Sequence, residues 1–107
     1  MLGQLMTSSD AIAVHADEAA RLLRSLANPH RLMVLCLLGE GERCVGELNT
    51  ALALSQSALS QHLAVLREEG LVATRREGQT IYYRVPPGPA LQILQVLHGI
   101  YCAAPSA

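Results

Sequence analysis

The residues of this 107-residue chain that are best suited to covalent chemistry are three cysteines, Cys36, Cys44 and Cys102. A thiolate can attack another sulfur atom, join a disulfide or bind a thiophilic metal ion. The N-terminal residues lack the basic segment of a secretory signal, so we expect a cytoplasmic protein, in which three cysteines are not a structural disulfide framework. The thiols are interpreted as reactive groups, metal ligands or small apolar side chains.

Each cysteine has its own sequence context. Cys36 lies on the apolar face of a predicted helix, where a cysteine commonly acts as a small hydrophobic side chain. Cys102 ends another predicted helix, and His98 precedes it by one turn. His98 could therefore stabilise a thiolate, share a metal ion with Cys102 or simply pack at an interface. Cys44 lies near the start of a third helix, whose dipole could favour its thiolate, so it is a possible third redox-sensing residue.

Charge is informative through its distribution and not through its total. The formal net charge is −1, so the chain lacks the overall basic character of many nucleic-acid-binding proteins. All eight basic residues are arginine, whose planar side chain can bind two phosphate oxygens at once. Half of them lie close together in the sequence: Arg67, Arg75, Arg76 and Arg84. These four indicate either phosphate contacts or an ordinary charged surface.

The periodicity of apolar residues predicts one mainly helical domain over residues 10–107, after a flexible N-terminal arm over residues 1–9. Capping residues and glycines divide the domain into five helices, over residues 10–27, 29–39, 45–51, 56–69 and 89–102. Two β-prone segments, residues 71–76 and 80–85, are predicted to form a hairpin that turns at Gly78. The absence of Trp and Phe implies a core of aliphatic side chains.

The fourth predicted helix has two chemically different faces. Leu59, Leu63 and Leu66 recur at helical spacing and are predicted to point inward. The opposite face carries short side chains with hydrogen-bonding groups, Gln56, Ser57, Ser60 and Gln61. Two helices joined by a tight turn and followed by an arginine-bearing hairpin are typical of a winged helix-turn-helix. We therefore expect the polar face to contact base edges in the major groove of double-stranded DNA, and the four arginines to contact flanking phosphates.

The last predicted helix is apolar around most of its circumference. A single core contact needs only one apolar stripe, so the remaining side chains require a further partner. A second copy of the chain is the simplest partner, and the first helix is expected to share the interface. A homodimer of this kind would bind DNA with an inverted repeat, its half-sites roughly one helical turn apart.

Several segments together resemble one known family. They are Leu26-Ala27-Asn28-Pro29-His30-Arg31-Leu32, Val45-Gly46-Glu47-Leu48, the run from Leu54 to Arg67, and Gly70-Leu71-Val72. These segments are similar to those of the ArsR/SmtB family of winged-helix repressors, and the similarity covers nearly the whole chain. The resemblance implies a homodimeric transcriptional repressor that leaves its operator when it senses an inducer.

The cysteines bear on which inducer the resemblance implies. A Cys-Val-Cys metal motif of the family corresponds here to Cys44-Val45-Gly46, and the Asp-x-His set of its zinc site is missing from residues 89–107. The positions of Cys36 and Cys102 instead resemble the persulfide- and redox-sensing branch of the family. That resemblance implies that a sulfur oxidant links the two thiols within one subunit, as a disulfide or polysulfide, and so weakens DNA binding.

One alternative keeps the same fold but changes the inducer. Cys36, Cys102 and His98 could bind a thiophilic metal ion, because thiolate and imidazole groups are ligands of zinc and softer ions. An enzyme is not expected, because no nucleophile is paired with a base and no glycine-rich phosphate loop occurs. No cofactor is expected either.

Overall fold

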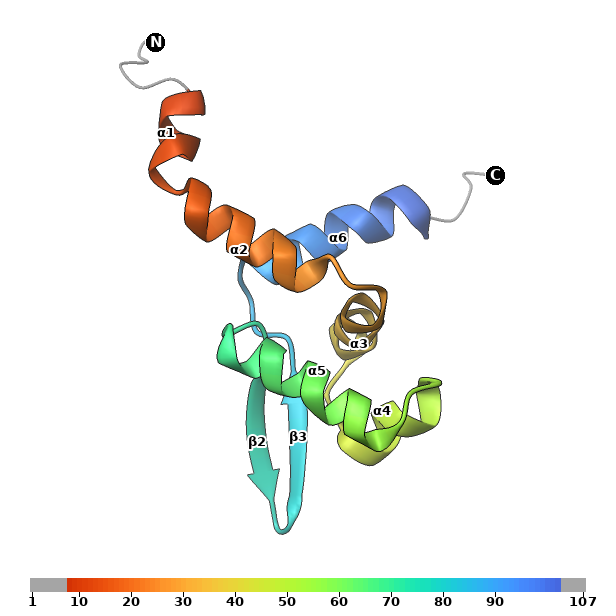
Figure 1. The fold of residues 1–107 in the computed structure, drawn as a ribbon. Helices are drawn as coiled ribbons and strands as arrows, with labels where there is room; N and C mark the ends of the chain where they lie inside the picture. The colour runs from red at the N-terminus through yellow and green to blue at the C-terminus, as the bar shows by residue number, and fades with distance from the viewer. Residues whose placement is uncertain (1–7, 103–107) are drawn as a thin grey trace.

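The computed structural model describes residues 8–102, which form a mainly helical fold with a small antiparallel sheet (Figure 1). The elements in chain order are α1 (Ser8–Val14), α2 (Ala16–Leu26), α3 (Pro29–Glu40), β1 (Arg43–Cys44), α4 (Val45–Ala51), α5 (Gln56–Glu68), β2 (Ala73–Glu77), β3 (Thr80–Arg84) and α6 (Pro89–Tyr101). This order confirms the predicted winged helix-turn-helix. Helices α4 and α5 are joined by a short turn, and β2 and β3 form the wing below α5 in Figure 1.

The N-terminal helical region differs from the single helix expected over residues 10–27. It is interrupted at His15, whose φ of −111° and ψ of 13° are not helical. The His15 amide donates a hydrogen bond to the Ile12 carbonyl at 3.0 Å, which closes a tighter turn than an α-helix makes. The sequence has no glycine or proline at this position to indicate a break. Because of the break, the described residues form six helices, whereas the sequence predicts five.

The predicted arm over residues 1–9 lies mostly outside the described residues, and α1 already begins at Ser8. Within residues 8–102, every helix is too short or too polar to cross a membrane.

The sheet has one strand more than the predicted hairpin. In the wing, Arg75 on β2 lies opposite Tyr82 on β3, and Gly78 forms the turn with a φ of 64° that favours glycine. The additional strand β1 pairs with the other edge of β3, which places Cys44 opposite Tyr82. A strand of two residues has no alternation of its own, so the sequence pattern does not reveal it.

Local interactions determine where α3 and α5 begin and where α5 ends, as predicted. The Asn28 side chain accepts hydrogen bonds from two amides of the first turn of α3, both at 3.0 Å, and Pro29 takes the first helical position. The Ser55 hydroxyl accepts one from the Ala58 amide at 3.0 Å and caps α5. Gly70, with a φ of 75°, ends that helix in the left-handed conformation.

An aliphatic core joins the helices. Its fully buried side chains come from α3, α4 and α5 and include Val34, Leu35, Leu48, Leu59 and Leu66. Burial of one such side chain stabilises a fold by about 1.5–3 kcal/mol. Helix α3 packs against both α5 and α6, so it connects the two ends of the molecule.

Candidate nucleic-acid interface and thiol pair

The outer face of α5 is polar and exposed, as the sequence predicts. Leu59, Leu63 and Leu66 are buried on the inner face. All four side chains predicted to contact base edges are exposed, namely Gln56, Ser57, Ser60 and Gln61. Their small size leaves α5 slim enough for the major groove of DNA, which admits one helix.

The turn before α5 is held by a residue that the sequence analysis did not single out. The Asn49 side-chain amide donates a hydrogen bond to the Leu54 carbonyl at 3.0 Å. This bond joins α4 to the residue that precedes the Ser55 cap, and it therefore fixes how α5 leaves the turn. An asparagine three residues before the apolar link Leu52–Leu54 is a usable signal, because its side chain commonly satisfies turn carbonyls.

A shallow hollow lies between α5 and the wing. It is lined by Ser60, Leu63, Ala64, Arg67 and Glu68 from α5 and by Tyr83 from β3. The exposed Arg67 side chain therefore borders the surface between the helix and the wing. Within residues 8–102, Arg67 has no carboxylate within ion-pair distance.

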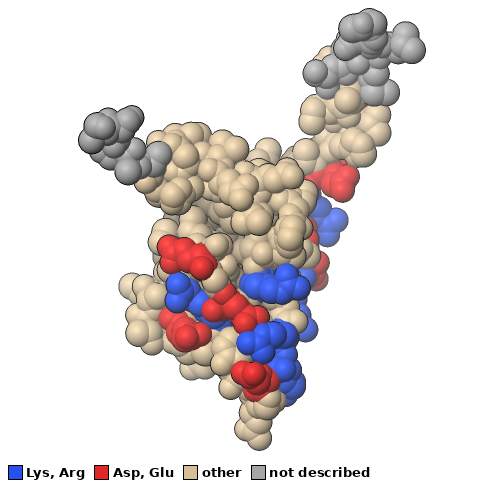
Figure 2. Space-filling model, turned by 180° about the vertical axis from the view of Figure 1, so that it is seen from behind, with Lys and Arg blue, Asp and Glu red and all other residues tan. Residues whose placement is uncertain are grey.

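The structure divides the wing arginines between the two faces of the hairpin. Because neighbouring strand residues alternate between faces, Arg75 and Arg84 lie on one face, while Arg76 shares the other with Tyr83. Arg76 thus lies on the side of the hollow. Seen from behind, arginine and acidic side chains are interleaved over the lower half of the molecule (Figure 2).

Arg75 already has a partner within the chain. Its guanidinium group lies 2.8 Å from the Glu42 carboxylate, 3.7 Å from that of Glu77 and 4.5 Å from the centre of the Tyr82 ring. The hydrogen bond from Arg75 lowers the pKa of Glu42, and the charges of Arg75 and Arg84 lower it further. Of the four arginines predicted to contact phosphate, Arg67 and Arg76 therefore differ in surroundings from Arg75 and Arg84.

The thiols of Cys36 and Cys102 are exposed and free, and they lie on two helices that pack together, α3 and the end of α6. Partial burial raises the pKa of the Cys36 thiol, and the nearby Cys102 thiolate and Glu40 raise it further. Cys36 is thus not the core-filling side chain that its apolar sequence context allows.

Cys44 lies apart from this pair, in β1 at the N-cap of α4, and is partly buried. Its amide donates a hydrogen bond to the Glu47 carboxylate at 2.9 Å, and this bond lowers the pKa of Glu47.

The described residues do not form a group of three or more His, Cys, Asp or Glu side chains able to hold a metal ion. His98, one turn before Cys102, is exposed on α6. Cys36, Cys102 and His98 are therefore not assembled into a metal site within one chain.

Large apolar side chains are exposed at the end of the molecule opposite the wing. On α6, Val96, Ile100 and Tyr101 are 61%, 63% and 80% exposed. Ile12 and Val14 on α1 and Leu23 on α2 are also exposed. We refer to these six residues as the apolar surface. A surface of this kind is typical of a protein interface.

Two histidines join α3 to α5. The rings of His30 and His62 lie 5.7 Å apart, centre to centre. Partial burial lowers the pKa of His62, and the nearby Arg31 and His30 lower it further. His62 is therefore favoured in its neutral form where it packs.

Comparison with known proteins places these features in a family. Residues 28–74 match the model of the bacterial regulatory protein, arsR family. The transcriptional activator HlyU of Vibrio cholerae is 49% identical over 90 residues, which cover 84% of this chain and 83% of HlyU.

Solved structures agree with that similarity. The transcriptional repressor BigR from Xylella fastidiosa matches with a TM-score of 0.82 and 45% identity, over 92% of this chain and all of BigR. Reduced HlyU from V. cholerae gives a TM-score of 0.81 at 45% identity, over 87% of this chain and 98% of HlyU. The homodimeric winged helix-turn-helix DNA-binding domain of Mb0332 from Mycobacterium bovis gives 0.72 at 34% identity, over 94% of this chain and 89% of that domain.

Proposed function

The chain belongs to the ArsR family and is a DNA-binding transcriptional regulator, and we propose that it is a homodimeric repressor released from its operator when Cys36 and Cys102 are oxidised. The observation that carries this proposal is the thiol pair. Two exposed thiols lie on α3 and at the end of α6, two helices that pack together, and α3 also packs against the helix with the polar outer face, α5.

The DNA-binding part of the proposal rests on α5. We infer that Gln56, Ser57, Ser60 and Gln61 contact base edges in the major groove, with Arg67 and Arg76 on the flanking phosphates. Arg75 and Arg84 contribute less in this proposal, because Arg75 is bound to Glu42 and Arg84 lies on the same outer face.

The homodimer follows from the apolar surface of α1, α2 and α6. Exposed residues such as Ile100 and Val96 are costly to leave in water, and a two-fold related copy would cover both surfaces at once. The similar domain of Mb0332 is homodimeric. Two α5 helices in such a dimer would bind an inverted repeat in operator DNA.

The proposed inducer is a sulfur oxidant such as a low-molecular-weight persulfide. We assign the first attack to Cys102, because partial burial and nearby negative charge raise the pKa of Cys36 and so lower its thiolate fraction. The Cys102 thiolate takes the outer sulfur of the persulfide and releases a thiol. Cys36 then attacks the persulfidated Cys102, a disulfide forms, and hydrogen sulfide leaves with the two electrons.

A polysulfide link is the second form of the same reaction. If both thiols are persulfidated first, their reaction releases one hydrogen sulfide and leaves a trisulfide. The extra sulfur atom relaxes the limit of about 7 Å between Cα atoms that a plain disulfide requires. Either link would tie the end of α6 to α3 and shift α5 through their shared packing. A coupling of about 1–3 kcal/mol between thiol state and DNA affinity is of ordinary size.

A DNA-shift assay with reduced and persulfide-treated protein tests the proposal. We expect treatment to abolish DNA binding by the wild type and by Cys44→Ser, the matched control, but not by Cys36→Ser or Cys102→Ser. Mass spectrometry of the treated wild type should find Cys36 linked to Cys102 in one chain. If persulfide treatment still releases Cys36→Ser and Cys102→Ser from DNA, the mechanism is refuted.

A further inference from the structure

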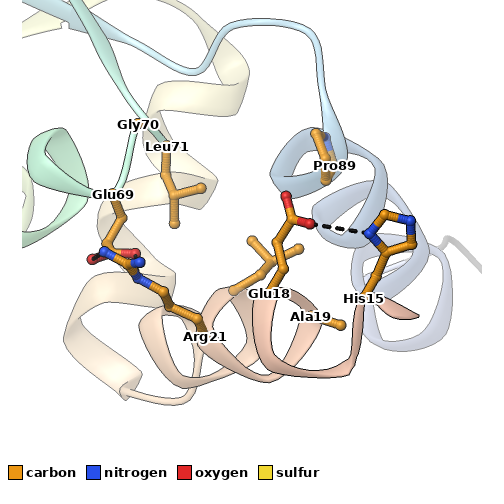
Figure 3. A pocket seen from close by; sticks show the side chains of 9 residues that line it. His15, Glu18, Ala19, Arg21, Glu69, Gly70, Leu71 and Pro89 are labelled. Atoms are coloured by element: carbon orange, nitrogen blue, oxygen red, sulfur yellow. Dashed lines mark hydrogen bonds and ion pairs between the residues drawn. The ribbon is translucent and has the colours of Figure 1, made fainter. Parts of the chain in front are cut away.

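One ion pair joins the end of α5 directly to α2. The Arg21 Nε atom lies 2.7 Å from Oε1 of Glu69, and its terminal nitrogen lies 3.1 Å from Oε2. The two residues are 48 positions apart in the sequence. Glu69 is the C-cap residue of α5, so the paired carboxylate marks where that helix ends. Figure 3 shows the Arg21 side chain reaching from α2 to this carboxylate.

The pair lies beside a hollow and not within packed side chains. An open pocket of about 460 Å³ separates α2 from the loop after α5, with Leu22, Gly70, Leu71 and Pro89 among its lining residues (Figure 3). Apolar packing therefore does not fill the space that the guanidinium group crosses. Where packing is incomplete, a two-point hydrogen-bonded contact defines distance and angle better than scattered apolar contacts do.

The surroundings of the pair strengthen it. The Glu69 side chain is only 20% exposed, although that of Arg21 is 66% exposed. The hydrogen bond and the charge of Glu69 raise the pKa of Arg21.

We propose that Arg21 and Glu69 are a positioning pair that fixes the separation of the two α5 helices in the dimer, and thereby the half-site spacing of the DNA that it binds. This inference rests on the proposed DNA-binding homodimer. Helix α2 contributes Leu23 to the apolar surface, whereas α5 carries the DNA-facing residues. The pair therefore joins the proposed dimer interface to the end of the proposed recognition helix.

The experiment uses full-length protein and DNA duplexes selected by the wild type from a randomised library. The selected half-sites are then moved closer or further apart by one or two base pairs. We expect Arg21→Ala and Glu69→Ala each to reduce the ratio of affinities between the best and the worst spacing by about threefold, the scale of one surface ion pair. The double variant should reduce it no further, because both changes break one contact.

Arg24→Ala is the matched control, since it removes one exposed positive charge from the same helix. It should keep the spacing preference of the wild type. An unchanged preference in Arg21→Ala, or an equal loss in Arg24→Ala, would overturn the proposal.

Hydrogen exchange without DNA separates this inference from the proposed function. Amides of residues 66–71 should exchange faster in Arg21→Ala than in Arg24→Ala, and equal rates would overturn the positioning role. Failure of the wild type to select any duplex would instead refute the proposed function and leave the exchange result to decide whether the pair holds the end of α5.

Discussion

The two ends of this molecule differ in how completely one chain builds them. At the wing end, α5 has its leucines buried, its cap formed and its polar side chains exposed, so a single chain presents a finished surface. At the opposite end, α1 and α6 expose Val14, Ile100 and Tyr101 to solvent. The contrast indicates that each chain forms the proposed DNA-contacting face by itself, whereas the proposed dimer interface needs a second copy to cover it.

The largest effect is expected on the free energy of unfolding, when a core side chain that anchors α5 is removed. Leu66→Ala removes a fully buried side chain from α5 and should lower the free energy of unfolding by about 2–5 kcal/mol. Urea unfolding followed by circular dichroism measures it. Its neighbour Val65 is 36% exposed, so Val65→Ala should cost less than about 1 kcal/mol. Equal losses would mean that α5 is not anchored by its inner face.

The next effect tests whether the apolar surface is the dimer interface. Ile100→Glu places a charge within the apolar surface and should raise the dimer dissociation constant about thirtyfold, equivalent to about 2 kcal/mol. Sedimentation analysis measures the constant, and circular dichroism should report an intact fold. Gln95→Glu introduces the same charge at an exposed polar position of α6 and serves as the control. If the dimer dissociation constant of Ile100→Glu equals that of the wild type, the interface lies elsewhere.

A smaller effect distinguishes the hollow beside α5 from the face of the wing that carries Arg75. Arg67→Ala should weaken DNA binding by about 1 kcal/mol and reduce the salt dependence of binding by about one phosphate contact. Arg75→Ala should do less, because Glu42 and Tyr82 already engage that guanidinium group. Binding isotherms at several salt concentrations measure both quantities. A larger loss in Arg75→Ala would show that the Glu42 pair opens on DNA.

The smallest effect concerns the junction between the two ends, at His30 and His62. The pKa of His62 is lowered from its ordinary value of 6.5 in the folded protein, so the unfolded chain binds protons more readily. Stability should therefore fall as the pH decreases through 6.5 and level off below the lowered folded pKa. Urea unfolding at a series of pH values should show this dependence reduced in His62→Gln.

His98→Gln removes an exposed imidazole on α6, away from this junction, and serves as the control. An unaltered pH dependence in His62→Gln would assign the titration to other groups.

Local patterns in the sequence were sufficient to predict α4, the beginnings of α3 and α5, and the wing. These features depend on interactions between near neighbours, such as Asn28 and Ser55 with the amides that follow them and Gly78 in its turn. The buried leucines of α5 were predictable for the same reason, because helical periodicity alone decides which side they share.

The break at His15 and the strand β1 were not predictable in this way. Histidine is not a helix-breaking residue type, so nothing in the sequence marks the break at His15. The strand β1 forms only because β3 lies beside it. Both features depend on contacts or backbone angles that no local pattern encodes.

The sequence by itself determined which chemical groups the chain carries: an odd set of thiols, a polar helix face, arginines without lysine, and an apolar last helix. Only the tertiary structure decided which of these groups meet. It placed Cys36 and Cys102 on two helices that pack together, paired Arg75 with Glu42 and joined Arg21 to Glu69, residues that are 66, 33 and 48 positions apart. Contacts over such separations depend on how helices and strands pack, and packing is a property of the whole core rather than of any segment.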